Sequence, residues 1–287
     1  MPKFVEKYDY QEIHVEEISQ IYQIVNDYNL FYKLPRQGRG DPRDEWTFLQ
    51  AFYRGQSDSS WKIMPSICRD KSVDESISQS GDLLFENMAY NQHYIQPTRL
   101  IDFTTDIDVS LFFACCENLD KDAAIFIWSY SPDDSQWKRT KIQCELINVE
   151  KERISISEYA EIVFQKYPKL NEEYRYKKKS FYAELVSYLD HGFMIMQPRN
   201  PQVENVRIQR QKGCLYVCGV KVETPIDEMR TSVNAGNNIL CPHEVVVPKE
   251  LDGGKFLVKV IIPAELKSTM MKHLEKKGIT KEYLLPD

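Results

Sequence analysis

The sequence predicts an α+β fold, a single mixed domain in which a central sheet is flanked by helices. Short apolar runs rich in β-branched and aromatic residues are interspersed irregularly with segments of helical periodicity, a pattern typical of mixed folds. At 287 residues the chain can bury a substantial core, and we favour one large domain over two modest ones.

Residues 1–44 are expected to form a helical extension before a main domain at 45–287. Apolar residues from Ile18 to Val25 recur at helical spacing and predict a helix over 15–28. This helix would precede the first strand of the main domain.

The main domain opens with a strand predicted over 47–53. Gly55 permits a turn directly after it, so Arg54 would project over the edge of the sheet. A guanidinium in such a place suits a phosphate or a carboxylate, because its fork donates two parallel hydrogen bonds. Gln56 follows and is a second candidate ligand-binding residue.

Two helices are predicted on either side of a short polar connector. Apolar residues at helical spacing predict the first helix over 82–94, and Pro97 prevents its continuation. Thr104 or Thr105 is expected to cap the second helix, which runs through the apolar stretch 111–116. The connector would therefore be held between two buried helices.

The remaining elements follow from local patterns. Strands are predicted near 123–128, 142–149, 193–196, 214–218, 244–247 and 256–262. Ser155 and Glu158 form a capping box at the start of a helix, and a later helix over 264–277 is ended by Gly278. The polar run 172–179 is predicted to be a mobile insertion.

The stretch 90–105 concentrates polar chemistry between those two apolar helices. Polar groups removed from water must find partners or a ligand. The candidates here are Gln92, His93, Thr98, Arg99 and Asp102. Taken singly, each has a structural alternative: Arg99 and Asp102 as an ion pair, and His93 as a histidine at a helix end. The cluster as a group favours a site.

A further polar run, 204–213, ends at Gly213 before a predicted strand. It places Arg207 and Gln211 at the mouth of that strand, although a solvated turn is the alternative. With Lys177 to Lys179, it also offers a local basic patch on a chain whose formal charge of −6 gives no overall attraction to nucleic acid.

These segments, in this order, resemble the FRG domain, a family named after its Phe/Tyr-Arg-Gly motif. The resemblance covers about 45–287. The residues that carry it are Tyr53-Arg54-Gly55-Gln56, Trp61, Pro65, Ser66 and Arg69; Gln92-His93-Tyr94, Pro97-Thr98-Arg99-Leu100, Asp102-Phe103-Thr104, Leu111, Phe113 and Ala114; Arg207-Ile208, Gln211 and Gly213; and the C-terminal Ile262-Pro263-Ala264, Gly278-Ile279-Thr280 and Leu285-Pro286-Asp287. Leu215 and Leu285 depart from the aromatic residues more usual in the family, which affects packing rather than the polar residues.

The resemblance implies a bacterial or phage protein in a defence or toxin setting, but the family's activity is itself uncertain. Other classes lack their motifs. There is no Gly-x-Gly-x-x-Gly, no Gly-Lys-Ser/Thr loop and no Gly-x-Ser-x-Gly elbow. The seven cysteines include no Cys-x-x-Cys pair, so we expect no metal site. Cys115 and Cys116 are expected to be small core residues, and a reducing cytoplasm without membrane insertion fits this composition.

Two functions remain open. The first is a transferase or hydrolase acting on a nucleotide such as NAD, similar to ADP-ribosyltransferases, with nucleic acid or protein as a possible target. Its catalytic residues would be His93, Asp102 and Gln211, and its ligand-binding residues Arg54, Gln56, Gln92, Thr98, Arg99 and Arg207. The second is a non-catalytic module that senses a nucleotide or a phage component. A phosphate-bearing ligand suits the site, since guanidinium, imidazole and amide groups prevail in it.

Three further expectations follow from the sequence. Carboxylates are scarce, with Asp102 and Glu244 as the available candidates for catalysis. A single pocket requires Arg54, His93, Arg99 and Gln211 to converge within about 10 Å. If Asp102 chiefly anchors Arg99, its loss should cost roughly 3 kcal/mol of stability.

Overall fold

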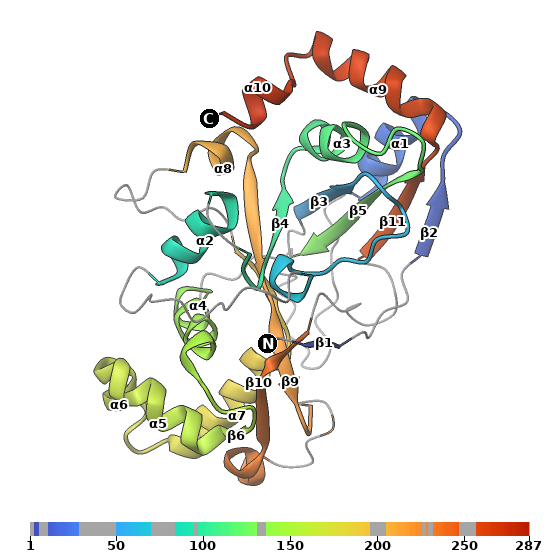
Figure 1. Ribbon diagram of the computed structural model, residues 1–287. Coiled ribbons are helices and arrows are strands. Elements are labelled where there is room, and N and C mark those ends of the chain that lie inside the picture. The colour runs from blue at the N-terminus through green and yellow to red at the C-terminus, as the bar shows by residue number, and fades with distance from the viewer. Residues whose placement is uncertain are drawn as a thin grey trace, which may run out of the picture.

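A seven-stranded sheet organises the structure (Figure 1). The computed structural model describes residues 3–5, 11–28, 50–69, 84–94, 97–130, 136–195, 205–225, 228, 232–246 and 257–286. In sheet order the strands are β2 (Gln11–His14), β11 (Leu257–Ile262), β5 (Ala123–Tyr130), β3 (Gln50–Gln56), β4 (Leu100–Thr104), β8 (Gly213–Val217) and β7 (Phe193–Ile195). Neighbouring strands are antiparallel except β2 and β11, which run parallel.

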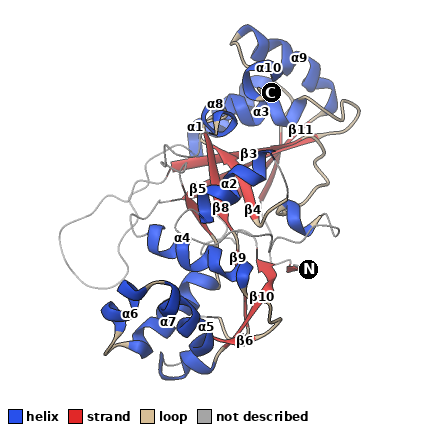
Figure 2. Ribbon diagram, turned by 60° about the vertical axis from the view of Figure 1, so that its left-hand side comes forward, coloured by secondary structure: helices blue, strands red, loops and turns tan. Residues whose placement is uncertain are grey.

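Helices cover this sheet at one end of the molecule. They are α1 (Ile18–Tyr28), α2 (Leu84–Tyr94), α3 (Ile107–Cys115), α8 (Val206–Arg210), α9 (Ala264–Lys276) and α10 (Lys281–Leu284). Buried residues of α1, α3 and α9 share one apolar core with β3, β5 and β11. A second cluster joins α2 to β4, β7 and β8. Figure 2 shows α3, α9 and α10 together at this end of the molecule.

A smaller sheet lies at the other end of the molecule. Its strands are β1 (Lys3–Val5), β10 (Ile239–Val246), β6 (Ile154–Ser155) and β9 (Gly219–Val222). Its helices are α4 (Gln136–Cys144), α5 (Ile156–Lys166), α6 (Pro168–Tyr174) and α7 (Lys178–Leu189). These helices and β9 and β10 bury a core of their own. Cys218 alone separates β8 from β9, so the chain passes directly from one sheet to the other.

The structure confirms the α+β fold class and several elements. The capping box of α5 forms as predicted, with Ser155 accepting from the Glu158 amide and Glu158 accepting from the Ser155 amide. Helix α9 ends before Gly278, which has the left-handed φ of 79° that favours glycine at a helix end. Predicted strand residues 47–49, 196, 247 and 256 lie outside the described residues.

The described N-terminal residues divide between the two sheets, with β1 in the smaller sheet and residues 11–28 joined to the larger one. Strand β2 pairs with β11 from Gln11 to His14. Ile21 and Val25 of α1 are buried in the core that contains α3 and α9. Residues 29–49 are outside the described ranges, so the domain boundary expected at 44 stays a prediction.

Two predictions about the smaller lobe are wrong. The strand predicted at 142–149 is the end of α4 followed by a short 3₁₀ helix, Glu145–Asn148. Its buried residues Ile142, Leu146 and Val149 recur at helical spacing, a signal that the apolar run concealed. The mobile insertion predicted at 172–179 lies in α6, α7 and their short link, where Tyr174 packs against Phe181.

The polar connector is also different from the prediction. Leu100–Thr104 is strand β4, which lies in the middle of the large sheet. Helix α3 is capped by Asp106, whose carboxylate accepts from the Asp108 amide, rather than by Thr104 or Thr105. Thr104 instead accepts from the Asp106 amide at 3.0 Å. No helix in the described ranges combines the length and apolar character needed to cross a membrane.

Candidate functional site

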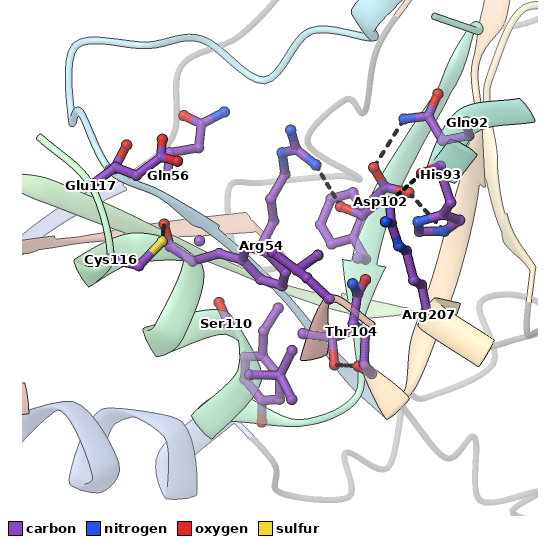
Figure 3. Close-up of a pocket in the computed structure, with 18 of the residues that line it drawn as sticks. Arg54, Gln56, Gln92, His93, Asp102, Thr104, Ser110, Cys116, Glu117 and Arg207 are labelled. Atoms are coloured by element: carbon purple, nitrogen blue, oxygen red, sulfur yellow. Dashed lines mark hydrogen bonds and ion pairs between the residues drawn. The ribbon is translucent and has the colours of Figure 1, made fainter. Parts of the chain in front are cut away.

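A cavity opens where the two central strands of the large sheet part. Strand β3 pairs with β5 along its length, and β4 pairs with β8 along its length. Within these described strands, β3 and β4 meet only at Tyr53 and Thr104. Beyond that pair they diverge, and a cavity of about 330 Å³ lies there (Figure 3). This volume is within the range of about 300–1,000 Å³ found for ligand sites.

The cavity gathers most of the residues predicted for the site. Those that line it are Arg54, Gln56, Gln92, His93, Asp102, Arg207 and Gln211. They come from β3, α2, β4 and the α8–β8 segment. Thr98 and Arg99 do not line it. Arg54, His93 and Gln211 line one cavity, as the convergence prediction requires, whereas Arg99 does not.

Gly55 brings helix α3 against β3 at the edge of the cavity. A Cβ on Gly55 would lie 2.0 Å from the Ser110 carbonyl oxygen and 2.8 Å from the Ala114 amide nitrogen. The prediction of a turn at this glycine is wrong, because Gly55 lies within β3. The glycine instead allows the backbones of β3 and α3 to touch. Arg54 is not at a strand end. It lies in β3 just beyond the last pair with β4, so its side chain still meets an open space.

Arg54 occupies the middle of the cavity (Figure 3). Its Nη1 donates to the Asp102 carbonyl at 2.7 Å, which bridges the gap between β3 and β4. Burial lowers the pKa of Arg54, an effect that nearby Asp102 opposes and Arg69 reinforces. Among the described residues, no carboxylate forms an ion pair with this guanidinium. Arg54 thus places a poorly solvated positive charge on the cavity wall.

His93 and Asp102 face each other on one side of Arg54. The distance between His93 Nε2 and Asp102 Oδ1 is 3.6 Å, too long for a hydrogen bond. The other carboxylate oxygen of Asp102 accepts from Gln92 Nε2 at 2.9 Å. Gln92 is itself fixed by Thr98, whose hydroxyl donates to Gln92 Oε1 at 2.6 Å. Thr98 therefore supports the site from behind the cavity wall.

Arg207 and Gln211 tie the cavity to the C-terminal segment. Arg207 donates to the His93 carbonyl at 2.8 Å and to the Pro286 carbonyl at 3.1 Å. Gln211 Nε2 donates to the Leu284 carbonyl at 3.0 Å. The backbone carbonyl of Gln211 accepts from the Thr104 hydroxyl. Much of the hydrogen-bonding capacity of both side chains is thus used to hold backbone in place.

Arg99 belongs to another part of the molecule. Its side chain is buried, and Nη1 lies 3.4 Å from the Pro242 carbonyl of β10. Arg99 and Asp102 are three residues apart in extended chain, so their side chains point to opposite sides. Asp102 contacts Gln92 and His93 instead, which removes the reason for the 3 kcal/mol expected from an Arg99 pair. Glu244 is likewise remote, since it pairs with Lys221 between β9 and β10.

Three residues of α3 and the turn after it were missed. Ser110, Phe113 and Glu117 line the cavity and recur at helical spacing, so they lie on one face. Their periodicity, continued from the start of the helix, is the signal that would have found them. Lys267 fixes the last of them by donating to the carbonyls of Glu117 and Ser57. Cys116, predicted to be core, is partly exposed and also lines the cavity.

Buried polar atoms without hydrogen-bond partners concentrate in this cavity. Among the described residues, five such atoms belong to its lining: Arg54 Nε, Gln56 Oε1, His93 Nε2, Asp102 Oδ1 and Ser110 Oγ. Native proteins satisfy most buried polar groups, so each exception needs an explanation. Five such atoms from two strands and two helices around one cavity indicate a site that a polar ligand completes.

A comparison with protein families finds a match in a part of the chain that helps to build this cavity. The family model of the FRG domain matches residues 70–123. That segment contains α2, β4 and α3, and it confirms the resemblance. No curated protein and no solved structure matches the chain.

Proposed function

We propose that the cavity binds a phosphate-bearing nucleotide, with NAD as the leading candidate, and that the protein transfers or hydrolyses its ADP-ribosyl group. The observation that carries this proposal is the set of five buried polar atoms without hydrogen-bond partners around the cavity, one of which is Nε of the Arg54 guanidinium. A ligand that offers both anionic oxygens and hydroxyls would satisfy them together.

The phosphate would lie against Arg54. A guanidinium removed from water gains most from an anion that accepts two hydrogen bonds, and phosphate has this geometry. Arg54 lines the cavity and its Nε has no hydrogen-bond partner, and Arg69 lines the same cavity. Two arginines near one space favour a phosphate or pyrophosphate over a neutral ligand.

His93 and Asp102 would perform the chemistry on the ribose. When the bond between C1′ and the nicotinamide nitrogen breaks, its electron pair leaves with the neutral base. The Asp102 carboxylate would stabilise the positive charge that develops on the sugar. His93 would accept the proton of the water or acceptor hydroxyl that forms the new bond to C1′. Their separation of 3.6 Å leaves both facing atoms free of hydrogen bonds for this role.

The competing function is a module that senses a nucleotide without turnover. It is favoured by the commitment of one Asp102 oxygen to Gln92 and of the Gln211 amide to Leu284. Such fixed contacts serve recognition as well as catalysis. The two functions share a ligand and differ only in what happens to it.

The test is to incubate the purified protein with NAD, alone and with nucleic acid. Mass spectrometry would follow nicotinamide release and any ADP-ribose added to protein or nucleic acid, and calorimetry would measure binding. Arg54→Ala should abolish binding and turnover, whereas Arg175→Ala, at an exposed arginine of the other lobe, should leave both unchanged. Binding without turnover supports the sensing module. If the protein neither binds nor turns over NAD, ADP-ribose or AMP, both the enzyme and the sensing module are rejected.

A further inference from the structure

We infer that the end of the cavity formed by Gln56 and Trp61 is a subsite for the base of the nucleotide, and that it selects a planar base that carries an N–H donor. This inference rests on the proposed function and specifies which part of the ligand each end of the cavity receives. It is carried by the orientation of one amide and the exposure of one large aromatic side chain.

The amide of Gln56 presents its oxygen to the ligand. The residue is buried, and Nε2 donates to the Lys62 carbonyl at 3.2 Å. A carbonyl can only accept, so the amino group must be on that side of the amide and Oε1 on the other. Oε1 has no partner. It can accept only, so the ligand must supply a hydrogen-bond donor.

Ser110 offers a hydroxyl on the opposite face of β3. Its carbonyl fills the space that a side chain on Gly55 would occupy, and side chains at the successive positions of Gly55 and Gln56 point to opposite faces of the strand. The Ser110 Oγ is buried, lines the cavity and has no hydrogen-bond partner. Ser110 is therefore not part of the base subsite.

Trp61 supplies a flat surface at the mouth. It lines the cavity, yet 43% of it is exposed, which is unusual for so large an apolar residue. It follows the turn in which Asp58 binds Ser60 and Lys121, and the Trp61 amide donates to the Asp58 carbonyl at 3.1 Å. An exposed indole on a fixed backbone is suited to stack on a base.

The position of this subsite determines where each half of a dinucleotide would lie in the cavity. Gln56 and Glu117 lie on one side of Arg54, and His93 and Asp102 lie on the other (Figure 3). With the phosphates at Arg54, a base stacked on Trp61 is the one that does not react. For NAD this is the adenine, whose amino group would donate to Gln56, and the ribose of the nicotinamide would face His93.

Three ligands measured by calorimetry test the inference. AMP has the amino group, purine ribonucleoside 5′-phosphate has the same ring without it, and ribose 5-phosphate has no base. AMP should bind about tenfold more tightly than the purine analogue and more tightly again than ribose 5-phosphate. If ribose 5-phosphate binds as well as AMP, the base subsite is wrong while a phosphate site remains. If no nucleotide binds, the proposed function fails as well.

Variants separate stacking from hydrogen bonding. Trp61→Ala should weaken AMP about tenfold and ribose 5-phosphate hardly at all, and Trp61→Phe should restore most of the loss. Tyr176→Ala is the matched control, because Tyr176 is 88% exposed in the other lobe. Gln56→Met should remove the preference for AMP over the purine analogue. If Trp61→Ala weakens all three ligands equally, its role is structural and the inference fails. The Trp61 series decides the matter even if Gln56→Met does not fold.

Discussion

His93 separates binding from turnover more clearly than any other side chain of the cavity. Its side chain is 8% exposed, and its Nε2 faces Asp102 without a hydrogen bond. A group held in this way can take a proton during the reaction but contributes little to holding phosphate. Arg54 should act mainly in binding, since its positive charge is present both before and during the reaction.

His93→Gln should therefore lower kcat for NAD by about 100-fold or more, the usual contribution of a general base. Affinity for ADP-ribose should change by less than about threefold, because the phosphate contacts remain. Initial rates of nicotinamide release and calorimetry measure the two effects, with exposed His14→Gln as the control. An unchanged kcat would remove His93 from the chemistry.

Single residues also show how far the site could be predicted. Local composition identified Gln92, His93 and Asp102, because polar groups between apolar helices need partners. It failed for Arg99, since the direction of a side chain depends on whether its segment is a strand or a loop. It failed for Ser110 because a serine in an apolar helix reveals its place in the site only through its helical spacing with Phe113 and Glu117.

The contact between β3 and α3 determines the shape of the cavity. Gly55 lies where the two backbones touch, and the atoms around it belong to the main chain. Backbone cannot move aside as a flexible side chain can. Any side chain at this position must therefore separate the helix from the strand.

Gly55→Ala should lower the free energy of unfolding by about 3 kcal/mol, at the upper end of the usual range for overpacking. Gly278→Ala is the matched control. It has open space around it and a φ of 79°, so it should cost only about 1 kcal/mol from backbone strain. Urea unfolding of both variants measures the difference. Equal losses would mean that α3 can move away from β3 at little cost.

The capping box of α5 makes stability depend on acid pH. Hydrogen bonds from the amide and hydroxyl of Ser155, together with Lys151, lower the pKa of Glu158 from 4.5 to about 2. Because the pKa is lower in the folded state, the stabilisation is fully present above pH 4.5 and is lost as pH falls towards 2.

Glu158→Gln should keep the box but remove this dependence, since glutamine also accepts from the Ser155 amide. Between pH 4.5 and about 2, the variant should lose less stability than the wild type. Urea unfolding followed by circular dichroism at each pH tests this, with exposed Glu152→Gln as the control. Parallel curves for the wild type and both variants would contradict it.

Local signals predicted helices and strands well where one period dominates. The box at Ser155, the end of α9 at Gly278 and the strands β5 and β11 are examples. The prediction failed at 142–149, where apolar residues fit both a strand and a helical face. It also missed β1 and β2, whose strand form is completed by pairing with β10 and β11, far away in sequence.

The position of the cavity is a property of the whole chain. It exists because β3 pairs with β5 and β4 pairs with β8, while β3 and β4 share one pair only. These pairings connect segments up to about a hundred residues apart, so neither composition nor spacing predicts the gap. None of the described residues of the second lobe, which has its own core with α5 to α7, lines the cavity.

This separation predicts where a ligand changes the protein's dynamics. A ligand that binds only the folded state stabilises the elements it contacts, and amide hydrogen exchange reports this locally. Saturating AMP should slow exchange in β3, the end of α2, β4 and α3, while residues 156–189 of the other lobe exchange as before. Hydrogen exchange with mass spectrometry, with and without AMP, measures both regions, and Arg54→Ala should abolish the difference. Slower exchange confined to α5 and α7 would move the binding site out of the cavity between β3 and β4.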